Sequence, residues 1–269
     1  MLPAHEADAH DSLRVPGDRM IVWPSLRVML HLFSGLCTSA FVFPFIAAAS
    51  RDRRIKLWSI QLLAILRVQV EVQLRPGAEA MPQGLIVANH VSWLDIFVIN
   101  TLQPCRFVAK ADIRSWPALG WLCTKAGTIF IARGKQREVR RVYEGLVASI
   151  RAGEHIAFFP EGTTTAQGSM LPFHSNLFEA AIEAQVPVQP YALRYVDEHG
   201  RLHPAADFIG DMTFVDSMLL IMKVRKMTAQ LILLPALDTA GAHRRDLALA
   251  AHAAIAEALG YAERPEQTA

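Results

Sequence analysis

Two apolar segments lie close together near the N-terminus of the chain. Residues 28–50 (VMLHLFSGLCTSAFVFPFIAAAS) contain no formally charged side chain, and residues 57–66 (LWSIQLLAIL) are apolar again. A helix rises about 1.5 Å per residue, so the first segment is long enough to cross a hydrocarbon layer of roughly 30 Å. We expect it to span the membrane, or to lie in it as a re-entrant or interfacial helix, and to pair with the second segment as a hairpin.

Two other interpretations of residues 28–50 stay open. A cleaved signal peptide would have an Ala-x-Ala-like end at residues 47–49, although the stretch before its apolar part would be 27 residues long. A buried core helix is the other interpretation. Basic residues follow at positions 51, 53, 54 and 56. By the positive-inside bias they predict the inner membrane, with the rest of the chain facing the cytoplasm.

From residue 68 onward, strand patterns alternate with helix patterns. Residues 68–74 alternate apolar and polar side chains, as a half-buried strand does, and Val139, Val142, Leu146 and Ile150 recur at helical spacing. The expected strands are residues 68–74, 85–88, 107–109, 128–132, 155–159, 188–195 and 229–234, and the expected helices are residues 92–102, 116–125, 136–152, 175–185, 214–224 and 244–259.

This repeated order of strand and helix predicts an α/β fold. We expect a central mixed, largely parallel β-sheet flanked by helices and preceded by an N-terminal membrane-associating helical hairpin. The chain then divides into a disordered tail (residues 1–20), membrane-associating helices (21–67), an α/β domain (68–262) and a polar tail (263–269).

Composition and charge narrow the class of protein. Hydrophobic residues make up 52% of the 269 positions and charged residues 19%, which excludes a disordered chain. The scarcity of long apolar stretches excludes a bundle of many membrane helices. The net charge of +2 conceals a basic segment, residues 106–151, which has ten Lys or Arg against three acids. It favours an anionic partner, with a solvated helix face at residues 137–141 as the alternative.

Two further classes are not expected. The basic segment is not accompanied by a zinc-finger, RRM or KH pattern, so nucleic acid is not an expected partner. Cys37, Cys105 and Cys123 are too few and too scattered for a disulfide framework, and we expect them to be reduced.

The candidate chemistry lies at the ends of predicted strands. Asn89-His-Val-Ser-Trp-Leu-Asp95 follows strand 85–88, and Ser92 is a candidate N-cap of the next helix. If His90 remains in the turn, the chain can fold back so that Asp95 reaches the imidazole. An Asp that accepts a hydrogen bond from one ring nitrogen leaves the other basic, which makes His90 a candidate general base. A surface His beside an Asp in a first helical turn is the alternative.

Two more strand ends carry polar residues. Phe159-Pro-Glu-Gly-Thr-Thr-Thr165 follows strand 155–159; its hydroxyl and backbone N–H groups can bind an anion, and Glu161 can orient a substrate or the base. Arg133, after the 128–132 strand pattern, offers a bidentate fork for phosphate, and Lys110 is a second cation in an equivalent place. The alternatives are an ordinary turn and surface charges.

Four blocks in order, NHVSWLD, GTIFIARG, FPEGTTT and VPVQPYAL, resemble the membrane glycerolipid acyltransferases of the 1-acyl-glycerol-3-phosphate type, the HxxxxD acyltransferases. The resemblance implies that His90 and Asp95 are the catalytic pair and that Arg133 binds the acceptor phosphate. It implies no metal and no cofactor, with acyl-carrier protein or acyl-CoA as the acyl donor. The expected substrate-binding residues are Asn89, Lys110, Arg133, Glu161, Gly162, Thr163 and Thr164.

The implied reaction is transfer of a fatty acyl group to the free hydroxyl of a lysolipid, 1-acyl-glycerol-3-phosphate in the first instance. One departure matters, because Thr164 stands where the family commonly has Arg. The variant Gly-Thr-Thr followed by LPFHSNLF resembles a subgroup that acylates lyso-ornithine lipid and other lysolipids, which is the alternative acceptor class. More distant alternatives are a membrane-bound metal-dependent hydrolase, with His155 and His174 as further ligands, and a non-catalytic lipid-binding protein.

Overall fold

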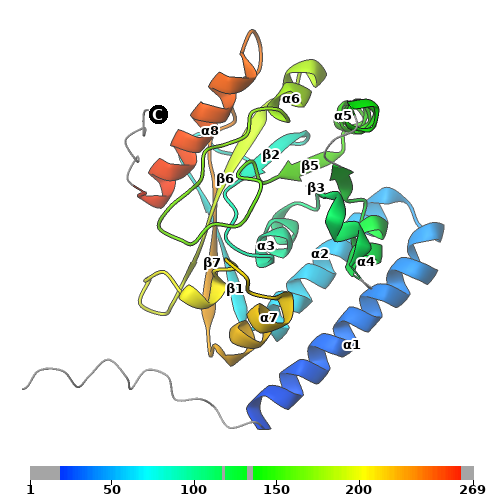
Figure 1. Cartoon of the computed structure of the whole chain (residues 1–269), viewed down its shortest axis with the longest axis vertical. Coiled ribbons are helices and arrows are strands. Elements are labelled where there is room, and N and C mark those ends of the chain that lie inside the picture. Colours follow the sequence, from blue (N-terminus) through cyan, green and yellow to red (C-terminus); the bar gives the residue numbers. More distant parts are fainter. Residues whose placement is uncertain (1–18, 117–118, 132–135, 262–269) are drawn as a thin grey trace, which may run out of the picture.

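Seven strands form one mixed sheet at the centre of the computed structural model, which describes residues 19–116, 119–131 and 136–261 (Figure 1). The strands are β1 (Val68–Leu74), β2 (Gly84–Ala88), β3 (Arg106–Lys110), β4 (Ile129–Ile131), β5 (His155–Phe158), β6 (Val188–Val196) and β7 (Met227–Leu233). Their order across the sheet is β1-β7-β6-β2-β5-β3-β4. Among the strand pairs of the described residues, only β6–β7 is antiparallel, so β2 to β6 all point the same way. The mixed, largely parallel sheet is confirmed.

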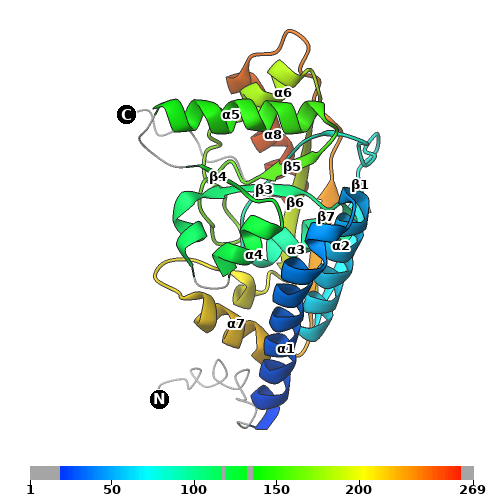
Figure 2. The same ribbon diagram turned by 90° about the vertical axis from the view of Figure 1, so that its right-hand side faces the viewer.

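Helices cover both faces of this sheet (Figures 1 and 2). They are α1 (Arg19–Phe41), α2 (Ala48–Ile65), α3 (Leu94–Leu102), α4 (Leu119–Lys125), α5 (Gln136–Arg151), α6 (Phe178–Ala184), α7 (Phe214–Lys223) and α8 (Arg244–Leu259), with short 3-10 turns at Phe43–Phe45, Ala111–Ser115 and Pro204–Ala206. One core cluster joins the sheet to α2, α3 and α7, and a second joins it to α5, α6 and α8.

The central strand β2 shows why its sequence is apolar throughout. Ile86 and Ala88 belong to the core cluster on the α2–α3 side, whereas Leu85 and Val87 belong to the cluster on the α5–α6 side. Successive side chains of a strand point to opposite faces, so a strand covered on both faces needs apolar residues at every position. The turn that begins at Asn89 follows directly after this buried strand.

The N-terminal helices form the expected hairpin, with different bounds. The expectation of a single helix over residues 28–50 was wrong, because α1 ends at Phe41. The second helix, α2, begins at Ala48, well before the expected start at residue 57. Pro44 lies in the 3-10 turn between them, where its missing N–H and fixed φ suit a chain reversal. His31 and Trp58 stack with ring centroids 4.5 Å apart, and each bonds the other's carbonyl, which joins α1 to α2.

The outer face of α1 is apolar and uncovered. Among the described residues, Trp23–Phe45 is the stretch long and apolar enough to cross a membrane, with a mean hydropathy of 1.6, and only 28% of it is buried. Its exposed large side chains are Trp23, Leu26, Met29, Leu30, Phe33, Phe41 and Phe45. So much exposed apolar surface argues against a buried core helix and fits membrane association. Helix α2 instead buries Leu62 and Leu63 in the main core.

Several predicted boundaries move in the structure. Helix α3 begins at Leu94, so Ser92 is not its N-cap, and the buried Ser92 hydroxyl has no hydrogen-bond partner within the described ranges. The expected helix 116–125 is the shorter α4, which begins at Leu119 and is preceded by the 3-10 turn at Ala111–Ser115, and α6 begins at Phe178 rather than at residue 175.

Candidate functional site

The candidate site lies at the carboxyl edge of the parallel strands. Strands β2 and β5 are neighbours in the sheet, with Val87 opposite Phe158, so the turns that follow them meet. The Thr165 N–H donates to the His90 carbonyl at 2.8 Å, which joins the two turns directly. The residues singled out after the two strands, His90 and Glu161, are therefore brought together by the topology.

His90 and Asp95 form a hydrogen-bonded pair, as the sequence led us to expect. The distance from His90 Nδ1 to Asp95 Oδ2 is 2.8 Å. The Asp95 side chain is fully buried, whereas 18% of the His90 side chain is exposed. Within the described part of the chain, His90 Nε2 has no partner. With the carboxylate on Nδ1–H, the basic nitrogen of the ring is therefore Nε2.

The Asp95 carboxylate is fixed from four directions. Oδ2 also accepts hydrogen bonds from the backbone N–H groups of Val91 (2.8 Å) and Ser92 (2.9 Å), so it organises the turn that holds His90. Oδ1 accepts from the Tyr195 hydroxyl at 2.6 Å. Burial first, and then the Asp95 charge, raise the pKa of Tyr195 well above its usual value, so the hydroxyl stays a donor.

Tyr195 was not among the residues predicted from the sequence. It lies on β6, one hundred positions from Asp95, in a strand that is buried along most of its length. The single available signal was general: a buried tyrosine needs a partner for its hydroxyl. That signal does not identify the partner.

Glu161 supports the same turn through its backbone. Oε1 accepts the His90 N–H at 2.8 Å, and Oε2 accepts the Thr165 hydroxyl at 2.7 Å and the Leu171 N–H at 2.9 Å. Phe159 stacks on the imidazole with ring centroids 3.9 Å apart and planes 7° from parallel. The expectation that Glu161 orients the base fits this geometry, in which the contact is made to the base's peptide N–H.

The other predicted substrate-binding residues differ in their hydrogen bonds and in their exposure. The Asn89 amide bonds both backbone polar groups of Leu193, at 2.8 and 2.9 Å, and thus ties β2 to β6. Gly162 has φ +71°, a conformation that favours glycine, and is exposed like Thr163 beside it. The Thr164 hydroxyl donates to the Phe208 carbonyl. Substrate contact by these residues stays a prediction.

Of the two predicted cations, the structure describes Lys110 but not Arg133. Lys110 is exposed at the carboxyl end of β3, one strand beyond β5 and on the same edge as His90. Arg133 lies outside the described residues. A strand order of β2-β5-β3-β4 places the ends of β3 and β4 progressively farther from His90.

Part of the basic segment serves the fold. Arg106 donates to the Gly127 carbonyl and the Ser149 hydroxyl and pairs with Glu154. Arg151 donates to the Glu183 carbonyl at 2.6 Å. An exposed i, i+4 pair joins the side chains of residues 140 and 144, as expected for a solvated helix face. Fewer basic side chains are therefore free to bind an anionic partner than the net charge of the segment suggests.

The ligands suggested for a metal-dependent hydrolase are separated. His155 is at the amino end of β5, the opposite edge from His90, and its ring contacts the Gln103 side chain. Only His174 lies near the predicted site, next to Gly162. In residues 19–116, 119–131 and 136–261, no three His, Cys, Asp or Glu side chains group in a way that could hold a metal ion. Cys37, Cys105 and Cys123 are free thiols.

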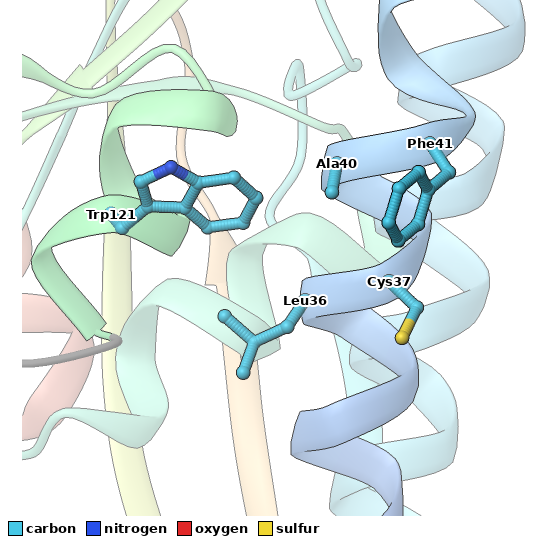
Figure 3. Close-up of a pocket in the computed structure, with 5 residues that line it drawn as sticks. All are labelled: Leu36, Cys37, Ala40, Phe41 and Trp121. Atoms are coloured by element: carbon cyan, nitrogen blue, oxygen red, sulfur yellow. The ribbon is translucent and has the colours of Figure 1, made fainter.

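An apolar groove of about 430 Å³ lies between α1 and α4, outside the His90 turn (Figure 3). It is lined by Leu36, Cys37, Ala40, Phe41 and Trp121. Figure 3 shows Trp121 on α4 and the other side chains on α1. The groove thus adjoins the exposed apolar face of α1.

Comparisons with known proteins show which sequences and folds this chain is similar to. The sequence model of the Acyltransferase family matches residues 69–194. The lyso-ornithine lipid O-acyltransferase of Pseudomonas aeruginosa is 37% identical over 81% of this chain and 83% of its own length. The 1-acyl-sn-glycerol-3-phosphate acyltransferase of Neisseria gonorrhoeae is 35% identical over 73% and 76%. The crystal structure of PlsC, the 1-acyl-sn-glycerophosphate acyltransferase of Thermotoga maritima, shares the fold, with TM-score 0.66, 18% identity and coverage of 92% and 97%.

Proposed function

The chain belongs to the lysolipid acyltransferase family, and on this premise we propose that it transfers a fatty acyl group from an acyl thioester to the free hydroxyl of a lysolipid at His90. The observation that carries the assignment of the site is the His90–Asp95 hydrogen bond of 2.8 Å, at the carboxyl edge of the sheet and with Nε2 of His90 left available. The donor is acyl-CoA or acyl-carrier protein, used as a co-substrate.

The proposed chemistry is direct transfer. Nε2 of His90 takes the proton of the acceptor hydroxyl as its oxygen attacks the thioester carbonyl carbon. Asp95, bonded to Nδ1–H, holds the ring and stabilises the imidazolium that forms. The C–S bond then breaks, the ester remains on the lysolipid, and the leaving thiolate takes the proton back from His90. No covalent enzyme intermediate is needed.

The acceptor is one of two lysolipids. We propose 1-acyl-glycerol-3-phosphate, which would give phosphatidic acid, with Arg133 and Lys110 bonding its phosphate. Lyso-ornithine lipid is the second candidate, and one observation favours it. Thr164 occupies the place where the family commonly has Arg, and its hydroxyl is engaged with the Phe208 carbonyl, so this position supplies no cation for a phosphate.

The apolar face of α1 suits an enzyme whose substrates are lipids. We propose that this face lies in the inner membrane, with residues 51–56 at the cytoplasmic surface and the α/β domain in the cytoplasm. The apolar groove between α1 and α4 is the surface on this face that we propose contacts an acyl chain of a lipid substrate.

Kinetics of two variants test the assignment of the site. His90→Ala should lower the rate of acyl transfer by about 10²–10⁴, the usual contribution of a general base. Asp95→Asn should lose much of the rate while the protein remains folded. A purified His90→Ala variant with near-normal acyl transfer would show that the base is elsewhere.

A further inference from the structure

Tyr195 reaches the Asp95 carboxylate from the centre of the sheet. Its hydroxyl is 2.6 Å from Oδ1, and the side chain is fully buried on β6. The backbone of Tyr195 is also fixed, because its N–H donates to Gln167 Oε1 at 2.7 Å and its carbonyl accepts from the His203 N–H at 2.9 Å. The backbone that carries the phenol is therefore held in place by these hydrogen bonds.

The two oxygens of Asp95 have different kinds of partners. The donors to Oδ2 are His90 Nδ1 and the N–H groups of Val91 and Ser92, all in the turn that carries the base. For Oδ1, the donor found within the described ranges is the Tyr195 hydroxyl. Tyr195 thus connects the carboxylate, and through it the imidazole, to the sheet rather than to the turn.

A hydrogen bond to an ionised carboxylate has an electrostatic effect as well as a geometric one. The donor stabilises the negative charge and so lowers the affinity of the carboxylate for a proton. Because His90 shares a hydrogen bond with the same carboxylate, a less basic Asp95 also stabilises the imidazolium less. Tyr195 should therefore weaken the interaction that stabilises the imidazolium.

Few other ionisable groups touch this pair. Among the described residues, those bonded to its side chains or backbone are Tyr195 from β6 and Glu161 from the turn after β5, which accepts the His90 N–H. Burial keeps Tyr195 protonated, as its strongly raised pKa indicates. Tyr195 is thus a permanent donor rather than a group that titrates with the base.

We propose that Tyr195 is a positioning residue for the base: its hydroxyl holds Oδ1 of Asp95 so that Oδ2 stays directed at Nδ1 of His90, and it weakens the binding of a proton by the imidazole. The role in catalysis rests on the proposed function, whereas the effect on His90 does not. The residue acts through Asp95 and needs no contact with substrate.

The direct test is the titration of His90, followed by NMR of the protein labelled in its histidine rings, in detergent micelles. Tyr195→Phe removes the donor and leaves the ring, so the titration midpoint of His90 should rise by about one pH unit. The acid limb of kcat/KM for acyl transfer should move upward by the same amount, since it reports the free enzyme's base. The KM for the lysolipid above that limb should stay unchanged.

Tyr191→Phe is the matched control. Tyr191 lies on the same strand, is equally buried, and donates its hydroxyl to Gln103 Oε1 at 3.1 Å. This variant also loses a buried hydrogen bond, but one that does not reach Asp95. It should be less stable than the parent protein and should leave the His90 midpoint where it was.

A second replacement keeps the test decisive if Tyr195→Phe fails to fold. A ring-fluorinated tyrosine at position 195 is a stronger donor of nearly the same size and should lower the His90 midpoint. An unchanged midpoint with fluorotyrosine, or with a folded Tyr195→Phe variant, would overturn the proposal. If the midpoint shifts as expected but no lysolipid is acylated, the proposed function fails while the coupling of Tyr195 to His90 stands.

Discussion

Glu161→Gln is the change that tests the support of the base most sharply. In the parent protein one carboxylate accepts three hydrogen bonds, from the His90 N–H, the Thr165 hydroxyl and the Leu171 N–H. Glutamine has nearly the same shape but keeps only one acceptor oxygen. If that oxygen stays on the His90 N–H, the new NH₂ group faces the Leu171 N–H, and two donors then meet.

The size of the effect follows from this count. The Thr165 hydroxyl can rotate to accept from the NH₂ group, but the Leu171 N–H cannot; a donor left without a partner costs up to about 1–3 kcal/mol when buried, and the Leu171 N–H is part-buried. The remaining bond to His90 also weakens, because its acceptor is no longer charged. We expect the free energy of unfolding to fall by about 2–4 kcal/mol, which corresponds to roughly 5–15 °C in apparent Tm for a domain of this size.

The assay combines thermal unfolding in detergent with acyl-transfer kinetics. A base displaced by a fraction of an ångström should transfer acyl groups on the order of 10–100-fold more slowly. Glu198→Gln is the control, since Glu198 is exposed and loses the same charge. If Glu161→Gln matches this control in both apparent Tm and kcat, the reasoning about the buried carboxylate is refuted.

Three further predictions concern the membrane face, the acceptor and a half-buried histidine. Phe33→Ser should weaken binding to vesicles about tenfold or more in a flotation assay, whereas Leu249→Ser, equally exposed on α8 on the opposite side of the molecule (Figure 1), should not; equal losses would place the membrane face elsewhere. Arg133→Ala should raise the KM for phosphate-bearing lysolipids more than for phosphate-free ones, and an equal rise would contradict its assigned role. Burial lowers the pKa of His155 below 6.5, despite the opposing charge of Asp52. The folded state then resists protonation, so stability falls as the pH drops below about 6.5. His155→Gln should flatten the difference in apparent Tm between pH 7.5 and 5.5, and an undiminished difference would assign the effect to other groups.

The fold was largely predictable because its signals are local and redundant. Residues 85–88 are apolar at every position since both faces of β2 are covered. The reversal at Pro44 was missed, because residues 28–50 were expected to form one helix. Helix ends were predicted less well. The α3 boundary is one case: the side chain that accepts from the backbone of the turn before α3 is Asp95, not the Ser92 hydroxyl.

The site was predictable only where the chain itself brings residues together. His90 and Asp95 are five positions apart, so a turn is enough to join them. Glu161 could be assigned to the same edge from strand order, but the sequence did not reveal that it would bond the N–H of His90. Tyr195 lies in an almost continuously buried strand, and its pairing with Asp95 depends on the register of β6 against β2, which no local pattern specifies.

The most direct test of the central claim follows the label from an acyl thioester. Membranes carrying the protein, or its His90→Ala variant, are incubated with labelled acyl-CoA or acyl-carrier protein and with 1-acyl-glycerol-3-phosphate, lyso-ornithine lipid and other lysolipids in turn. We predict that one of the lysolipids gains the labelled acyl group with the parent protein and that this transfer is lost with His90→Ala. Label that appears only as free fatty acid, or a lysolipid labelled equally well by both proteins, would contradict acyl transfer at His90.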